Sequence, residues 1–162
     1  MARGTMYEVV TDKDAVNAMS ASDFYYCLGE LGCEYVMDRD EEMSELDLEP
    51  FLGQLKKGGL AIEKEWGEGP CLKIGPLDEG KLHEAKKSIL HGLYVEFKKL
   101  AAAMTEDDFL KHEAAVGILS VLDDQYGDCV YLDGKIYTIA RFIREMEPDT
   151  VYYIGMKTVL LH

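Results

Sequence analysis

The most regular hydrophobic pattern in the chain covers residues 78–104. Apolar side chains recur there at every third or fourth position, which is the spacing of one face of an α-helix. They are Leu82, Ala85, Ile89, Leu93, Phe97, Leu100 and Met104. Asp78 and Glu79 stand at the beginning, where the partial positive charge of a helix N-terminus favours carboxylates. The pattern predicts a long amphipathic helix.

A second helix is predicted over residues 106–126, after a very short connection. Thr105 is a suitable N-cap, and the carboxylates that follow it suit a first helical turn. The segment is then apolar on nearly every side, through Ala114, Ala115, Val116, Ile118, Leu119, Val121 and Leu122. A helix without a polar face is typical of a protein interior. We therefore expect this helix to be the most buried element, and the substitution Leu119→Asp to prevent folding.

Short segments with β-branched, aromatic or alternating apolar residues predict strands on either side of the two helices. Asp133 and Gly134 are the favoured residue pair for a type I′ hairpin turn. Thr138 is a suitable cap for a short helix over 139–146. The expected strands are 6–10, 150–154 and 158–161, and the expected hairpins cover 60–74 and 129–137.

These elements predict a single α+β domain over residues 1–162. Its centre is the two-helix pair, about 78–104 and 106–126, flanked by short antiparallel β-hairpins and by an acidic N-terminal helical region. The acidic part covers residues 1–76, with expected helices at 12–19, 23–31 and 47–57. The helical core and the C-terminal hairpin cover residues 77–162.

The charge of the chain says more about its function than any sequence motif does. The formal net charge is −14 at pH 7. Residues 1–80 include 18 acidic and 7 basic residues, whereas residues 81–162 include 13 acidic and 10 basic residues. Direct binding to nucleic acid or to an anionic membrane is not expected, because phosphate contacts require Lys and Arg. We expect the partner to be a basic protein surface, which a negative surface would attract and select.

The acidic residues are densest in the segment 38–49, where seven carboxylates accompany one arginine. Like charges so close together repel one another, so fold stability alone does not require them. Aromatic residues just before this segment would supply buried contact area at low entropy cost. The candidate partner-binding residues are Asp38, Asp40, Glu41, Glu42, Glu45, Phe24, Tyr25 and Tyr35.

Catalytic and metal-binding motifs are absent from the sequence. It contains no G-x-S-x-G, phosphate-binding glycine loop, H-E-x-x-H or C-x-x-C pattern. The four cysteines, Cys27, Cys33, Cys71 and Cys129, are expected to be reduced thiols, and no cofactor is expected. The alternative is a small cytosolic enzyme or metal-binding protein that uses His or Glu on the central helices. Its candidates are His83, His91, His112, Glu84 and Glu113.

In size and acidity the chain resembles the small acidic accessory proteins of phages and mobile elements. These include anti-restriction proteins, anti-CRISPR proteins and toxin-immunity proteins, many of which cover a nucleic-acid-binding surface. The resemblance implies a cytoplasmic, non-catalytic inhibitor that imitates the charge of a nucleic acid. It extends to composition and length and to no individual residue.

Overall fold

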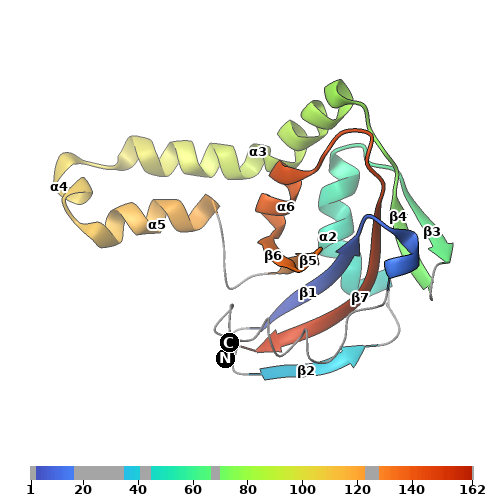
Figure 1. Ribbon diagram of the computed structural model, residues 1–162. Helices are drawn as coiled ribbons and strands as arrows, with labels where there is room; N and C mark the ends of the chain where they lie inside the picture. The colour runs from blue at the N-terminus through green and yellow to red at the C-terminus, as the bar shows by residue number, and fades with distance from the viewer. Residues whose placement is uncertain (1–2, 17–34, 41–44, 67–69, 123–127, 162) are drawn as a thin grey trace.

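The computed structural model describes residues 3–16, 35–40, 45–66, 70–122 and 128–161, and it has an α+β fold (Figure 1). Seven strands form one mixed sheet, in the order β3-β4-β7-β1-β5-β6, with β2 also paired to β7. The strands are β1 (Arg3–Val10), β2 (Tyr35–Asp40), β3 (Ile62–Trp66), β4 (Pro70–Ile74), β5 (Cys129–Leu132), β6 (Lys135–Thr138) and β7 (Tyr152–Leu161). The predicted fold class is therefore confirmed.

The long strand β7 organises the sheet. Along one side it pairs antiparallel with β1, from Arg3 opposite Leu161 to Val10 opposite Tyr153. Its other side is shared by two strands in succession, because β4 pairs with its first residues and β2 with its last ones. β1 in turn pairs in parallel with β5. The two strands expected over 150–154 and 158–161 are thus one continuous strand, which corrects that prediction.

The helical segments are the 3-10 turn η1 (Lys13–Ala15) and the α-helices α2 (Glu45–Lys57), α3 (Glu79–Ala103), α4 (Glu106–Phe109), α5 (His112–Leu122) and α6 (Ile139–Glu145). Local sequence accounts for several of their ends. The Asp78 carboxylate accepts a hydrogen bond of 2.9 Å from the Lys81 N–H at the start of α3. The Thr138 hydroxyl accepts one of 3.2 Å from the Arg141 N–H at the start of α6. Asp133 and Gly134 both have positive φ, as a type I′ turn requires.

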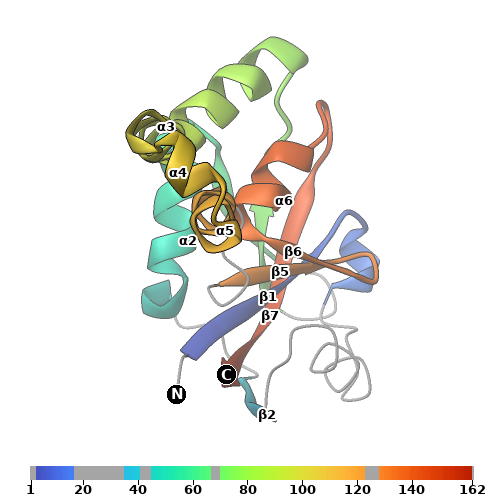
Figure 2. The ribbon, with the colours of Figure 1, turned by 90° about the vertical axis from the view of Figure 1, so that its left-hand side faces the viewer.

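The core lies between the sheet and the helices α2, α6 and the first turns of α3 (Figures 1 and 2). Aromatic rings link these layers. Tyr7 of β1 stacks on Phe51 of α2 with 4.9 Å between ring centroids, and Phe51 meets Phe142 of α6 at 6.2 Å. The fully buried residues around them include Val9, Leu55, Ile74, Val130, Ile143 and Ile154. Burial of this apolar surface is the main source of stability.

The end of α2 approaches α3 closely at a glycine. A Cβ atom on Gly58 would lie 2.6 Å from the Cδ1 atom of Ile89 on α3. The next residue, Gly59, has a φ of +77°, the left-handed conformation that commonly ends a helix. The two glycines thus let the chain leave α2 and bring α3 against it.

The most buried helix is not the one that the sequence predicts. The distal half of α3 runs away from the sheet, and α4 and α5 return along it, so that the three form a projecting arm (Figure 1). Leu119 on α5 is 60% exposed and Val116 is 45% exposed. The predicted helix over 106–126 is also divided, since α4 ends at Phe109 and α5 begins at His112. The expectation that this segment is the centre of the core is therefore wrong.

Among the residues that the structure describes, no helix is both long enough and apolar enough to cross a membrane. Of the four cysteines, Cys71 and Cys129 lie in this part of the chain, where both are buried and neither forms a disulfide. Cys27 and Cys33 lie outside the described residues, as do the expected helix over 23–31 and part of the one over 12–19.

Candidate functional site

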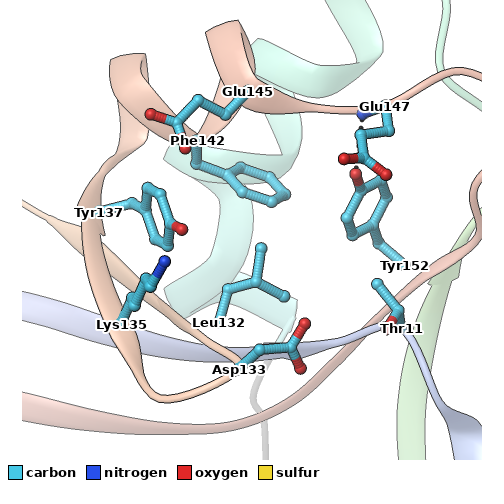
Figure 3. Close-up of a pocket in the computed structure, with 9 residues that line it drawn as sticks. All are labelled: Thr11, Leu132, Asp133, Lys135, Tyr137, Phe142, Glu145, Glu147 and Tyr152. Carbon is cyan, nitrogen blue, oxygen red and sulfur yellow. Dashed lines mark hydrogen bonds between the residues drawn. The ribbon is translucent and has the colours of Figure 1, made fainter.

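A cavity of about 270 Å³ opens at one end of the sheet, beside α6 (Figure 3). Four segments that are distant in the sequence build it: the end of β1, the β5–β6 hairpin, α6 with the residues after it, and the start of β7. Its lining residues are Thr11, Leu132, Asp133, Lys135, Tyr137, Phe142, Glu145, Glu147 and Tyr152. Several polar side chains meet an apolar wall in this cavity, which makes it the candidate binding site.

The inner wall of the cavity is aromatic. Phe142 and Tyr152 meet edge to face with 5.5 Å between ring centroids. Tyr137 lies across the opening from Tyr152, as Figure 3 shows. The Tyr152 hydroxyl accepts a hydrogen bond of 2.9 Å from the Glu147 N–H, which fixes the ring in place. Because β7 and α6 are both anchored in the core, this wall is a rigid part of the protein.

Carboxylates dominate the polar part of the lining. Asp133, Glu145 and Glu147 contribute three negative charges against the single ammonium group of Lys135. Glu145 also accepts a hydrogen bond of 2.9 Å from Arg141, whose guanidinium group lies 5.3 Å from the Tyr137 ring centre. Asp133 and Glu147 are exposed at the rim. The cavity therefore combines an apolar wall with an excess of negative charge.

Burial raises the pKa of the Tyr152 phenol. The hydrogen bond from the Glu147 N–H opposes this rise in part, and the charges of Glu147 and Asp133 each add a smaller increase. A tyrosine with an ordinary pKa of about 10 is already neutral at physiological pH, and the raised pKa extends this neutral range to higher pH.

The raised pKa of Tyr152 leads to a test by spectrophotometric titration. In the native protein at least one tyrosine should ionise only above the ordinary value of about 10. Stability should therefore fall as the pH rises above about 10, because the unfolded chain loses this proton first. The variant Tyr152→Phe should have one late-ionising tyrosine fewer than the wild type. An equal number in the two proteins would contradict the placement of Tyr152.

A second hollow, of about 490 Å³, lies where the arm leaves the body. It is lined by His83, Lys86, Lys87, Leu90, His91, Tyr94 and Arg144. The ammonium group of Lys86 donates hydrogen bonds of 2.7 and 2.6 Å to the carbonyl groups of Arg144 and Met146, at the end of α6. These bonds hold α3 against α6. This hollow, the base groove, thus carries positive charge in a strongly negative protein.

The three histidines of the enzyme or metal-binding alternative are not all brought together. His83 and His91 line the base groove, whereas His112 begins α5 at the far end of the arm. Glu84 forms an ion pair with Lys87 at 3.3 Å, and Glu113 lies in the first turn of α5. In the described ranges, no group of three or more His, Cys, Asp or Glu side chains is placed to hold a metal ion. The enzyme or metal-binding alternative therefore stays a prediction.

The predicted partner-binding residues are described only in part. Phe24, Tyr25, Glu41 and Glu42 lie outside the described residues. The backbone of Tyr35, Asp38 and Asp40 belongs to β2, and Glu45 is the first residue of α2. That these residues form one surface therefore remains a prediction.

β2 lies away from the cavity along the sheet. Asp40 is opposite Lys157 of β7, whereas the cavity contains Tyr152. Five residues of an extended strand cover roughly 17 Å. The cavity residues were not identified from the sequence, although the Asp133–Gly134 turn and the frequent tyrosines were both visible in it.

Comparison with known proteins gives no further guide. No family model matches the chain, and neither a characterised protein nor a solved structure is detectably similar to it.

Proposed function

We propose that this protein is a non-catalytic binding protein that docks on a basic surface of a partner protein. The observation that carries the proposal is the acidic cavity, in which carboxylates stand beside aromatic rings. Such a site suits the side chain of a lysine or an arginine from a partner. We further propose that the basic surface is one that binds nucleic acid, so that docking covers it in the manner of anti-CRISPR, anti-restriction or immunity proteins.

The chemistry of a Lys or Arg side chain matches the two parts of the cavity. Its aliphatic stem can lie along Leu132 and Tyr137, which are partly exposed, while its charged end reaches the rim. Guanidinium and ammonium groups are attracted to the faces of tyrosine rings, as the Arg141 guanidinium 5.3 Å from the Tyr137 ring centre illustrates in this cavity. Asp133 and Glu147 can then accept charge-assisted hydrogen bonds. A nucleic-acid-binding surface presents several such side chains.

The acidic segment 38–49 has a different part in the proposal. Its carboxylates would act before contact, by attracting the basic partner and orienting it. Together with Phe24, Tyr25 and Tyr35 it would form a second area of contact. The two surfaces should contribute separately. The cavity should govern the lifetime of the complex, and the acidic segment should govern the rate at which the complex forms.

The proposal is tested by affinity capture from a bacterial lysate with three forms of the protein. The first is the wild type. The second is Asp133→Asn combined with Glu147→Gln, which removes two charges at almost constant shape; asparagine tolerates the positive φ of position 133. The third replaces Asp40, Glu41 and Glu42 by lysine. The captured protein is identified by mass spectrometry and its binding kinetics are then measured.

We expect the wild type to capture a basic, nucleic-acid-binding protein. The cavity variant should release it about tenfold faster, and the lysine variant should bind it about tenfold more slowly at low salt, with a smaller difference as salt rises. The cavity variant should melt like the wild type, since the Asp133 and Glu147 side chains are exposed. The lysine variant should also stay folded, because it relieves repulsion among neighbouring carboxylates. Equal kinetics for all three forms, or a captured partner without a basic surface, would refute the proposed function.

A further inference from the structure

The arm has an unusual surface for the exposed end of a protein. Its tip carries two large apolar residues, Phe109 and Leu110, which are 69% and 78% exposed. Further exposed apolar side chains continue along both helices. They are Tyr94, Val95 and Leu100 on α3 and Val116 and Leu119 on α5. Exposed apolar surface of this extent on one element marks a site of protein contact.

The two ends of the arm are complementary in charge. The first turn of α4, at the tip, consists of Glu106, Asp107 and Asp108, with Lys111 just beyond it. The base groove, at the other end, contains Lys86, Lys87 and Arg144, and no carboxylate belongs to its described lining. All three cations also interact within the chain: Lys87 has an ion pair with Glu84, which lies outside the groove lining, Lys86 donates to the carbonyl groups of Arg144 and Met146, and Arg144 has a partner of its own. The tip is thus negative and apolar, and the groove is positive with an apolar wall formed by Leu90 and Tyr94.

We propose that the arm pairs antiparallel with the arm of a second copy of this chain, so that each tip occupies the base groove of the other copy. In a two-fold symmetric dimer every contact occurs twice, because the tip of the first copy contacts the groove of the second and the tip of the second contacts the groove of the first. An axis through the middle of the arm would bring both tips to both grooves at once. The opposite charges at the two ends favour this antiparallel arrangement and oppose a parallel one.

The dimensions of the arm agree with such a pairing. From Leu90 in the groove to Ala103 near the tip, α3 extends roughly 20 Å at 1.5 Å per residue. Two helices side by side present a face roughly 20 Å wide. A face of roughly 400 Å² in projection is about half of what each partner contributes to a standard interface, so the dimer is expected to be weak and transient. Phe109 and Leu110 would enter a groove of about 490 Å³, which is ample for two such side chains.

The proposal predicts a dimer of the full chain, measured by sedimentation equilibrium over about 1–200 μM at low salt. Reversing the charge at the tip with Asp107→Lys, or in the groove with Lys87→Glu, should weaken the dimer at least tenfold. Combining the two changes in one chain should restore most of the affinity, because the exchanged charges again face each other. Lys57→Glu, the same charge change at the end of α2, is the matched control and should dimerise like the wild type.

Leu110→Asp provides an independent check on the apolar contact. Leu110 is exposed, so the monomer should keep its melting behaviour while the dimer is lost. A wild type that stays monomeric at 200 μM would overturn the proposal. So would a dimer that is unaffected by both single charge reversals, or single variants that weaken it without rescue in the double variant, because another surface would then make the contact.

Discussion

The substitution Ile143→Asp should leave the protein unfolded at 25 °C, whereas Leu119→Asp should leave it folded. Ile143 on α6 is fully buried between the helices and the sheet, so a carboxylate there would lie without water or a partner. An uncompensated buried charge costs about 3–5 kcal/mol or more, a large share of the stability of a domain this size. Leu119 has most of its surface in water, and its replacement should cost less than about 1 kcal/mol.

Circular dichroism during urea unfolding measures this contrast. The proteins should be compared at low micromolar concentration, so that association through the arm does not contribute. A Leu119→Asp variant that cannot fold would show that α5 is an interior helix, as its sequence suggests. A stable Ile143→Asp variant would show that α6 does not lie in the core.

The substitution Phe142→Ala should lower the free energy of unfolding by about 3–5 kcal/mol. The ring of Phe142 is 1% exposed and connects Phe51 in the core with Tyr152 at the wall of the acidic cavity. Its removal leaves a void that the surrounding residues cannot fill completely. The effect should extend to binding, because Tyr152 then loses the neighbour that fixes the position of its ring.

Phe109→Ala is the matched control, since it removes the same ring from the exposed tip of the arm. Its free energy of unfolding should differ from that of the wild type by less than about 0.5 kcal/mol. The midpoint of denaturation in urea gives both values, provided that the slope of the transition is unchanged. Equal losses for the two variants would mean that Phe142 does not join the core to the cavity.

The parts of the fold that could be predicted from the sequence are those that nearby residues determine. The Asp133–Gly134 turn, the Thr138 cap and the capping box of Thr105 with Asp108 each depend on a few adjacent side chains and backbone angles. The long helix α3 was predicted because its apolar spacing is maintained over many turns. These features depend little on the rest of the chain.

The errors concern features that depend on distant parts of the chain. The apolar composition of α5 indicates a helix that must be covered, but composition does not say whether the same chain or another molecule covers it. The β-branched and aromatic residues over 150–154 and 158–161 predict two strands, whereas pairing with β1 on one side keeps β7 continuous between them. The acidic cavity takes residues from four separate segments, and no local pattern could show that they meet.

A dimer through the arms would also change how the proposed function operates. Each dimer would carry two acidic cavities, at opposite ends of the paired arms. A partner with two basic surfaces, or a partner that is itself a dimer, could then be held at both, and such double attachment strengthens binding without new contacts. The arm and the cavity would thus act together although they are far apart.

The most direct test of the central claim, that the acidic cavity binds a cationic side chain, uses two short peptides. One is acetyl-Ala-Arg-Ala-amide, and the other contains citrulline, which has nearly the shape of arginine without its charge. Each is titrated into isotope-labelled protein while the amide resonances of Asp133, Glu147 and Tyr152 are followed by nuclear magnetic resonance. The account predicts that the arginine peptide shifts these resonances at low salt, that the citrulline peptide does not, and that Asp133→Asn with Glu147→Gln abolishes the shifts. Equal shifts with the two peptides, or shifts confined to other parts of the sheet, would contradict it.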